Sequence, residues 1–349
     1  MKVAVYTIAL DEEQFVKRWY ESAKDADYLL IADTGSTDKT IKLAKSLGIN
    51  VININIVPWR FDDARNAALA AIPKDIDYCI ALDMDEVLQP GWKDELQKAF
   101  DAKYTRPRYQ YTWSWLEDGK PGLQYGGDKI HSRKNYRWKH PVHEVLTTST
   151  IDEVQGWIGL EIHHYPDSSK SRGQYLPLLA LSVKEDPQDD RNAFYYAREL
   201  FFNNSIEQAT EEFKRYLNLP TALWGAERGR AYRYLAQCNP NESLDYLNKS
   251  LYEDTSRRET YVDIALYYYR LEDWKNVFEF SEKALAIKDK PLDYLCEEFA
   301  WNELPYDLAA ISAYNLQNFD LARSYGKIAL DLQSNDKRLQ NNYKHYLES

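Results

Sequence analysis

The stretch DYCIALDMDEVLQPGW occupies residues 77–92. It carries three carboxylates, Asp83, Asp85 and Glu86, directly after an apolar run. Carboxylates this close repel one another and are costly to remove from water. In an extended segment residues i and i+2 share a face, so Asp83 and Asp85 can point at one object. Two carboxylates roughly 7 Å apart suit a hard divalent cation whose other ligands are water and phosphate oxygens. We therefore expect Mn²⁺ or Mg²⁺ here, bridging a diphosphate.

Short apolar runs alternate with helical patterns in the first quarter of the chain. Strands are expected at 3–9, 28–33, 50–55 and 78–83, and helices at 11–24, 37–48 and 62–72. Strands that are apolar throughout and separated by helices are typical of a parallel sheet covered on both faces. Ligand sites in such sheets lie outside the carboxyl ends of the strands. Asp33 and Asp83 lie at two of these ends.

The pattern changes twice further along the chain. Residues 108–115 alternate strictly, which predicts an amphipathic antiparallel strand whose aromatic face packs on the core or stacks on a sugar. Beyond residue 175 the chain reads as helical, and small residues or Val recur 34 residues apart at Ala209, Ser243 and Val277. This period resembles the tetratricopeptide repeat, in which helix pairs stack to bury their apolar faces. A plain helical bundle with chance spacing is the alternative.

The composition disfavours several classes of protein. The 349-residue chain carries a net charge of −11, which argues against non-specific binding to nucleic acid or anionic membranes. Its three cysteines are odd in number and include no CxxC pair, so we expect no disulfide framework and a reducing, cytoplasmic location. The N-terminal apolar stretch is too short and too soon acidic for a signal peptide, and no membrane span is expected.

Three further motifs precede the acidic stretch in a specific order. They are TIALDEEQFVKRW at 7–19, ADTGSTDKT at 32–40 and FDDARNAAL at 61–69. Followed by LDMDE, this succession resembles the family 2 glycosyltransferases of the GT-A fold, from about residue 1 to 170. Asp11 stands where that family usually has Asn.

The resemblance and the helical pattern together predict two domains. Residues 1–172 are expected to form a Rossmann-like α/β domain with a mostly parallel sheet, the GT-A catalytic domain. Residues 173–349 are expected to form an all-α domain of tetratricopeptide-like repeats. The helical domain would hold the acceptor, a protein partner or a second copy of the chain.

The resemblance also implies roles for individual residues. Thr7 and Asp33 would line the pocket for the base and ribose of a nucleotide-sugar. Arg65 would face the base or the diphosphate, since a guanidinium suits phosphate geometry; a surface ion pair with a neighbouring aspartate is the alternative. Asp83 would approach the ribose and the metal, and Asp85 would bind the metal directly.

Five of the six histidines fall between residues 131 and 164. The segments WKHPVHEVL (138–146) and IHHYP (162–166) resemble parts of repeat-bearing members of the same family. The second segment implies that His164 is the third metal ligand. Imidazole accepts Mn²⁺ readily and Mg²⁺ less so, which favours Mn²⁺.

Glycosyl transfer with inversion needs a base that takes the acceptor proton. Glu144, in the segment VHE, is the first candidate, and Asp128 in YGGDKIH is the second. His143 could orient the base or the acceptor. A salt bridge from Glu144 to Lys139 or Arg137 is the structural alternative. An acceptor that is already acidic would need no base.

The predicted function is therefore metal-dependent, inverting transfer of a sugar from a nucleotide-sugar. A UDP-sugar is the first expectation, because Asp33 suits a uracil contact. The acceptor stays open between a glycan, a protein and a modified nucleic-acid base. Two other functions remain: a haloacid-dehalogenase-type phosphatase, suggested by DMDEVL, and a repeat scaffold with an inactive transferase domain. Such a phosphatase would carry its motif on the first strand, whereas three predicted strands precede it here.

Overall fold

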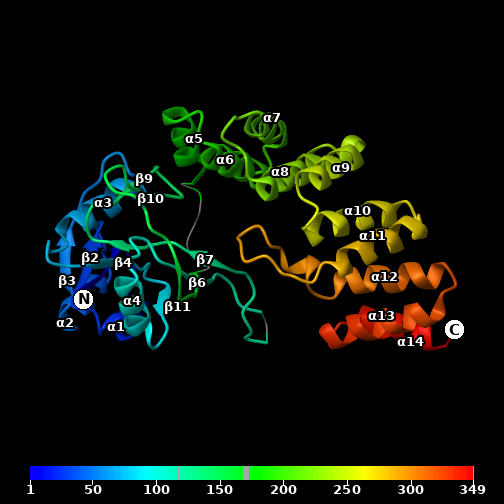
Figure 1. The fold of residues 1–349 in the computed structure, drawn as a ribbon, viewed down its shortest axis with the longest axis horizontal. Helices are drawn as coiled ribbons and strands as arrows, with labels where there is room; N and C mark the ends of the chain where they lie inside the picture. Colours follow the sequence, from blue (N-terminus) through cyan, green and yellow to red (C-terminus); the bar gives the residue numbers. More distant parts are fainter. Residues whose placement is uncertain (117, 168–172, 174, 349) are drawn as a thin grey trace. The chain divides into compact units, whose positions relative to one another are not determined.

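The computed structural model describes residues 1–116, 118–167, 173 and 175–348 (Figure 1). The chain divides into two compact units, Met1–Glu185 and Asp186–Ser349. The division follows helix α5 (Tyr175–Glu185), so this first helix after the predicted boundary at residue 172 belongs to the N-terminal unit.

The N-terminal unit is an α/β domain. Its other elements are β1 (Val3–Ala9), α1 (Val16–Ala23), β2 (Tyr28–Asp33), α2 (Thr40–Ser46), β3 (Asn50–Asn53), α3 (Phe61–Ala71), β4 (Tyr78–Ala81), β5 (Glu86–Leu88), α4 (Trp92–Asp101), β6 (Arg108–Thr112), β7 (Gln124–Gly127), β8 (Ile130–Ser132), β9 (Arg137–Lys139), β10 (Val145–Thr147) and β11 (Trp157–His164). The main sheet has the order β3-β2-β1-β4-β8, parallel except for β8. A second sheet, β5-β11-β6-β7, and the β9–β10 pair complete the unit. The predicted mostly parallel α/β domain is confirmed.

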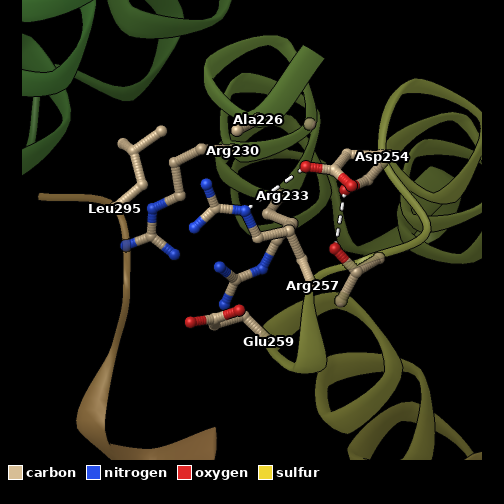
Figure 2. Close-up of a pocket in the computed structure, with 10 residues that line it drawn as sticks. Ala226, Arg230, Arg233, Asp254, Arg257, Glu259 and Leu295 are labelled. Atoms are coloured by element: carbon tan, nitrogen blue, oxygen red, sulfur yellow. Dashed lines mark hydrogen bonds and ion pairs between the residues drawn. The ribbon is translucent and has the colours of Figure 1, made fainter. Parts of the chain in front are cut away.

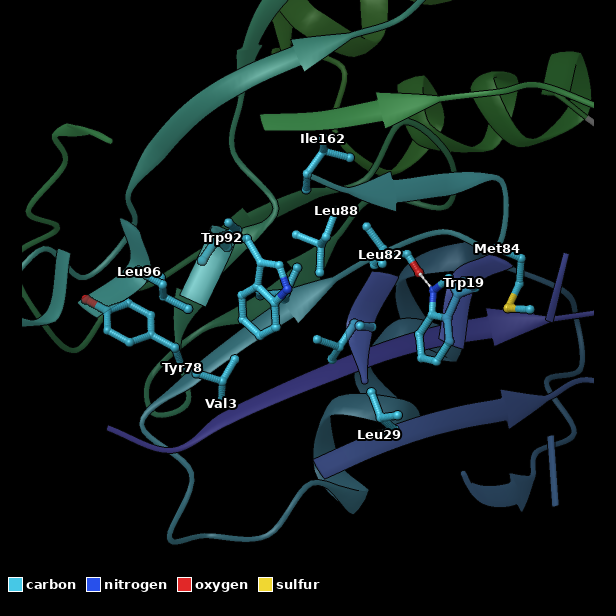
Figure 3. Close-up of a cluster of buried hydrophobic side chains, with 14 of the residues drawn as sticks. Val3, Trp19, Leu29, Tyr78, Leu82, Met84, Leu88, Trp92, Leu96 and Ile162 are labelled. Atoms are coloured by element: carbon cyan, nitrogen blue, oxygen red, sulfur yellow. Dashed lines mark hydrogen bonds between the residues drawn. The ribbon is translucent and has the colours of Figure 1, made fainter. Parts of the chain in front are cut away.

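The main sheet is buried on both faces. On β1, Val5 joins a core cluster with residues of α1 and α4, whereas its neighbour Tyr6 joins a second cluster with α3. Figure 3 shows the first cluster, in which Trp19 of α1 donates from Nε1 to the carbonyl oxygen of Leu82 at 2.9 Å. Leu82 precedes Asp83, so this bond ties α1 to the start of the acidic segment.

The acidic segment is a turn, which corrects the expectation that Asp83 and Asp85 lie on an extended strand. Strand β4 ends at Ala81. The backbone N–H of Glu86 then donates to the carbonyl oxygen of Asp83 at 2.9 Å and closes a turn between β4 and β5. Residues i and i+2 of a closed turn do not share a face as they do in a strand, so the two aspartates do not converge for that reason.

The aromatic stretch 108–115 is only partly a strand. Strand β6 ends at Thr112 and pairs antiparallel with β7 and parallel with β11. Tyr109 and Tyr111 are buried in the first core cluster. Of the two roles expected for this aromatic face, packing on the core is therefore the one that Tyr109 and Tyr111 have.

The C-terminal unit is all helical, as predicted. It contains α6 (Asp190–Phe202), α7 (Ile206–Leu217), α8 (Gly225–Cys238), η1 (Pro240–Glu242), α9 (Ser243–Glu253), α10 (Arg258–Arg270), α11 (Trp274–Ala286), η2 (Glu298–Ala300), α12 (Leu304–Asn315), α13 (Phe319–Leu332) and α14 (Lys337–Leu347). Consecutive helices pack in the pairs α6–α7, α8–α9, α10–α11 and α12–α13, and each pair contacts the next helix in the chain.

Small residues pack at the repeat positions of this unit. Ala209 and Val277, two of the expected repeat positions, are fully buried, each in the first turn of the second helix of its pair. Ala322 is buried at the same place in α13. In α9 the buried residue at that place is Tyr246, and Ser243 is only the first, half-buried residue of the helix. The expected 34-residue step therefore fails at Ser243, because the short helix η1 delays the start of α9.

No helix among the described residues is long and apolar enough to span a membrane. Cys79, Cys238 and Cys296 are all free thiols. Cys79 lies in the middle of β4, where burial raises the pKa of its thiol to about 12.

Candidate active site

The acidic turn is neutralised by two cations of the protein itself. Asp83 accepts hydrogen bonds from Arg65 Nη2 at Oδ1 (2.8 Å) and from Lys129 Nζ at Oδ2 (2.6 Å). Lys129 Nζ also donates to Oε1 of Glu86 (2.8 Å), and the hydroxyl of Tyr111 donates to the same oxygen (2.7 Å). Burial by itself would raise the pKa of Asp83, but Arg65 and Lys129 outweigh burial and hold that pKa well below its usual range. Asp83 is thus an ionised carboxylate with both oxygens engaged.

Arg65 connects the acidic turn to the VHE segment. It lies on α3 with 7% of its side chain exposed, and its Nε donates to Oε1 of Glu144. The guanidinium carbon lies over the Trp138 ring, 5.1 Å from the ring centroid, which adds a cation–π contact. Its third nitrogen, Nη1, is buried and has no hydrogen-bond partner among the described residues. One arginine therefore bridges Asp83 and Glu144, and the two N–H groups of its Nη1 have no partner among the described residues.

The two surface ion pairs considered from the sequence do not form. Asp62 binds Arg60, whose Nε and Nη2 donate to its two oxygens at 2.8 and 2.9 Å. Arg65 is buried and bonds to the strand end instead. Glu144 has 11% of its side chain exposed and is the partner of Arg65, not of a basic residue beside it in the sequence.

A second pair of predicted residues meets at the end of β11. His164 Nδ1 lies 3.0 Å from the carbonyl oxygen of Trp113, and Nε2 lies 3.2 Å from Oδ2 of Asp85. A carbonyl oxygen only accepts, so Nδ1 carries a proton, and Nε2 of neutral His164 presents a lone pair to the carboxylate. The lone pairs of Nε2 and of the Asp85 carboxylate repel each other unless a proton or a metal ion lies between them. The Trp113 ring stacks on the imidazole with 4.4 Å between centroids and fixes its plane.

The surroundings of His164 favour the protonated form of its imidazole. Burial lowers the pKa of His164, but its hydrogen bonds to Asp85 and to the Trp113 carbonyl outweigh burial and raise the pKa above the usual value. A histidine that donates one ring N–H to a backbone carbonyl and turns the other nitrogen to an open carboxylate is typical of metal sites.

Asp83 does not join this pair. Among residues 1–116, 118–167, 173 and 175–348, no group of three or more His, Cys, Asp or Glu side chains gathers as a metal site. The structure brings together Asp85 and His164, and it turns Asp83 to Arg65 and Lys129. A carboxylate and an imidazole leave most coordination positions to water and substrate oxygens, which suits Mn²⁺.

The loop after β2 is held by acidic side chains. Asp33 is 2% exposed, and its Oδ2 accepts from the backbone N–H groups of Gly35 (3.0 Å) and Ser36 (3.1 Å). Asp11 has a φ of 52°, and its Oδ1 accepts from the N–H of Thr37 at 2.7 Å. Asn and Asp tolerate this left-handed backbone better than other residues, so Asp11 can serve where Asn is usual.

The remaining predicted residues have the following places. Thr7 is fully buried on β1, and its hydroxyl donates to the next carbonyl oxygen of the chain at 3.0 Å. The Asp128 side chain is 41% exposed and accepts from Nη2 of Arg106 at 2.7 Å. The structure does not bring Asp128 into the network of Arg65.

His143 has a φ of 50°, and its ring meets the ring of Tyr175 of α5 edge-on, with 5.7 Å between centroids.

Another histidine of the cluster is structural. His131 is fully buried on β8; its Nδ1 donates to the carbonyl oxygen of Ser132 (2.8 Å), and its Nε2 accepts from the hydroxyl of Tyr6 (3.2 Å). The Tyr6 hydroxyl in turn accepts from Trp138 Nε1 at 2.8 Å. Burial lowers the pKa of His131 to about 4, so it is neutral and completes a chain of hydrogen bonds.

Comparison with known proteins concerns the family of the N-terminal unit. Residues 4–148 match the model of the family described as glycosyl transferase family 2. The N-terminal unit contains a family 2 glycosyltransferase domain. An uncharacterized glycosyltransferase of Rickettsia bellii is 31% identical over 109 residues, which are 31% of this chain and 35% of that protein. A TPR repeat-containing protein of Synechococcus elongatus is 28% identical over 179 residues, covering 47% of this chain and 42% of that protein. The chain thus spans less than half the length of each of these relatives.

Two solved structures show weaker likeness. Glucosyl-3-phosphoglycerate synthase from Mycobacterium tuberculosis, in complex with Mn²⁺, UDP and glucosyl-3-phosphoglycerate, is 22% identical and covers 32% of this chain and 44% of that chain, with a TM-score of 0.28. MamA is 19% identical and covers 49% of this chain and 96% of that chain, with a TM-score of 0.37. Both scores lie below 0.5.

The family 2 domain contains one functional candidate that the sequence reading missed, Lys129. It lies just before β8, beside Asp128, and reaches Asp83 only because β8 pairs antiparallel with β4. A lysine at the edge of an apolar strand was visible in the sequence. Its partner was not, because the pairing of strands 50 residues apart has no local signal.

The helical unit has a pocket of its own, lined by Arg230, Arg233 and Arg257 among others (Figure 2). Each arginine is already paired. Glu297 Oε2 accepts from Arg230 and from Arg233 Nη1 (2.6 Å), and Arg257 Nη1 donates to Asp293 (3.0 Å). The pocket is therefore a neutralised ion-pair network that ties α8 and the start of α10 to the segment between α11 and η2, not an exposed cationic site.

Proposed function

We propose that this chain is a metal-dependent, inverting glycosyltransferase that uses a nucleotide-sugar donor. The family 2 match over residues 4–148 supports the transferase class. The observation that carries the proposal is the approach of His164 Nε2 to Asp85 Oδ2. The other ring nitrogen of His164, Nδ1, donates to the carbonyl oxygen of Trp113. The phosphatase alternative has less support, because the acidic motif follows the fourth strand of the chain and not the first.

The donor would be bound by residues at the carboxyl ends of β1, β2 and β4. Asp33 and Thr7 would lie at the base and ribose. Asp85 and His164 would hold the divalent cation, with Mn²⁺ favoured over Mg²⁺. That cation would stabilise charge on the diphosphate as it leaves. Arg65 would support the same group, since its Nη1 lacks a partner among the described residues and a guanidinium matches phosphate oxygens.

Glu144 is the proposed base. It would take the acceptor proton while the acceptor oxygen attacks the anomeric carbon. Arg65 joins Glu144 to Asp83, so the base and the acidic turn belong to one network. Asp128 is the second candidate; it binds Arg106 and belongs to a separate cluster. His143, next to Glu144, would orient the base or the acceptor.

The donor and the acceptor are proposed by chemical class. A UDP-sugar is the first choice, with other nucleotides open. The acceptor is a glycan, a protein side chain or a nucleic-acid base. The helical unit would hold this acceptor, a protein partner or a second copy of the chain, because stacked helix pairs offer an extended binding surface.

Thermal unfolding with nucleoside diphosphates tests the proposal. A ligand that binds only the folded protein raises the unfolding midpoint. We expect one nucleotide to raise the midpoint only when Mn²⁺ is present, and Asp85→Asn to abolish that rise. Asp75→Asn is the matched control, since it removes an exposed carboxylate that pairs only with Lys2 among the residues described.

Each other outcome has a defined meaning. A rise that does not need Mn²⁺ would contradict metal dependence. No rise with any nucleotide would contradict the transferase proposal, and phosphate esters would then test the phosphatase. A Mn²⁺-dependent rise without any turnover of the nucleotide-sugar would favour the inactive scaffold.

A further inference from the structure

Lys129 spans the acidic turn from one end to the other. Its Nζ donates to Oδ2 of Asp83 at 2.6 Å and to Oε1 of Glu86 at 2.8 Å. Two bonds within the turn run between the same residues: Glu86 N to the Asp83 carbonyl oxygen (2.9 Å) and Asp83 N to Glu86 Oε2 (2.8 Å). The ammonium group therefore closes a ring of contacts around the turn.

Lys129 is itself held from two sides. Its carbonyl oxygen accepts from the N–H of Ala81, the last residue of β4, at 3.1 Å. Its ammonium lies 6.0 Å from the ring centroid of Tyr111 on β6. Its side chain is 26% exposed, so the cation is largely shielded from solvent. A cation fixed to both sheets can set the position of the loop between them.

Asp85 lies within this turn, between the two residues that Lys129 binds. Its carbonyl oxygen accepts from the N–H of Tyr165 at 2.9 Å, and its carboxylate approaches His164 at 3.2 Å. The conformation of the turn therefore decides whether the carboxylate of Asp85 meets the imidazole. Neither carboxylate oxygen of Asp85 accepts from Lys129, whose Nζ donates to Asp83 and Glu86.

The charge at Glu86 makes this arrangement depend on Lys129. Glu86 has 2% of its side chain exposed, and an ionised carboxylate so deeply buried is costly without a positive partner. Arg65 supplies a second cation to Asp83, whereas among the described residues Glu86 forms an ion pair with Lys129 alone. Removing the ammonium would leave Glu86 to reorient or to draw its end of the turn toward solvent.

We propose that Lys129 is a positioning residue for the metal-binding pair Asp85 and His164. It neutralises the carboxylates on either side of Asp85 and fixes the turn, so that Asp85 is the acid of the motif that remains for a cation. The inference rests on the proposed function, because it concerns the same metal site. It assigns to this residue a role that neither the family match nor the motif reading gives it.

The test is calorimetric titration of Mn²⁺ in the presence of the nucleoside diphosphate that passes the thermal assay. We expect Lys129→Met to weaken Mn²⁺ binding about tenfold or more, the usual loss when a residue that orients a metal ligand is removed. Lys129→Arg should recover most of the affinity, because a guanidinium can also donate to both carboxylates. Lys93→Met is the control: Lys93 pairs with Asp27 through a 3.3 Å contact in the same unit, and its loss should leave Mn²⁺ affinity unchanged.

The outcomes separate the inference from the proposed function. Unchanged Mn²⁺ affinity in Lys129→Met overturns the inference and leaves the proposed function standing. Equal losses in Lys129→Met and Lys93→Met also overturn it, because the effect would then be general destabilisation. No Mn²⁺ binding by the wild type overturns both. If Lys129→Met does not fold, Lys129→Gln is measured in its place and judged by the same outcomes.

Discussion

Nε2 of His164 lies 3.2 Å from a carboxylate oxygen of Asp85, although the two residues are 79 positions apart in the chain. The turn after β4 presents the carboxylate, and the end of β11 presents the imidazole. The antiparallel pairing of β11 with β5 places His164 opposite Glu86, one residue from Asp85. The two elements of the second sheet thus build the candidate metal pair.

Arg65→Met should destabilise the N-terminal unit strongly. The substitution leaves Asp83 and Glu144 without the guanidinium that bridges them, and removing one partner of a buried ion pair costs about 3–5 kcal/mol. Urea unfolding measures the change. Arg65→Lys should recover only part of the loss, since an ammonium cannot donate in the same forked geometry. Full stability of Arg65→Met would show that the bridge contributes nothing to folding.

Glu144→Gln should retain donor binding and lose transfer by about 10²-fold or more, because glutamine cannot accept the acceptor proton. The measurements are the Mn²⁺-dependent thermal shift and the release of nucleoside diphosphate from the matching nucleotide-sugar. Asp128→Asn, measured in parallel, should have a small effect. The reverse ranking of the two variants would move the base to Asp128.

Acid should destabilise the fold through His131. Its pKa is about 4 in the folded protein against 6.5 in the unfolded chain, so the unfolded state binds more protons between these values. The stability is fully present above pH 6.5 and falls as the pH drops toward 4, by about 3 kcal/mol for this group. His131→Gln should flatten this part of the curve of unfolding free energy against pH. An identical pH dependence in the variant would contradict the assignment.

The buried ion-pair network of the helical unit should contribute more to its unfolding free energy than the surface ion pairs do. Arg233 has 4% of its side chain exposed and binds both Asp263 and Glu297. Arg233→Met should cost about 3–5 kcal/mol of unfolding free energy, because two carboxylates lose a buried partner. Arg323→Met is the matched control, since its partner Asp320 is 93% exposed and such a pair contributes about 1 kcal/mol or less. Equal effects in denaturant unfolding would contradict the distinction.

A side chain at Gly127 should destabilise the N-terminal unit. A Cβ there would lie 2.2 Å from a ring carbon of Tyr109, its neighbour across β6 and β7. Gly127→Ala must shift a buried ring and should cost about 1–3 kcal/mol. Gly126→Ala should cost less, because its nearest neighbours are the ends of the Arg108 and Trp157 side chains, and Trp157 is 55% exposed. The unfolding free energies of the two variants, each compared with the wild type, measure this contrast.

The sequence by itself determined the architecture of the N-terminal unit and its family. Uninterrupted apolar strands separated by amphipathic helices bury both faces of a sheet, and that pattern is local. The order of the motifs around Asp33, Arg65 and Asp83 likewise needs only the linear chain. The helical unit was also readable, since a repeat that cannot bury its face alone shows itself as a period, although η1 shifted the step at Ser243.

Only the tertiary structure decided how the carboxylates of the acidic stretch are neutralised. The sequence suggested a cation between Asp83 and Asp85, whereas the fold gives Asp83 to Arg65 and Lys129 and turns Asp85 toward His164. The reason is that ion pairs are made between residues far apart in the chain, and strand register and turn geometry set which side chains meet. Propensity and periodicity fix elements, but the contacts between elements are decided when the sheets pair and the helices pack.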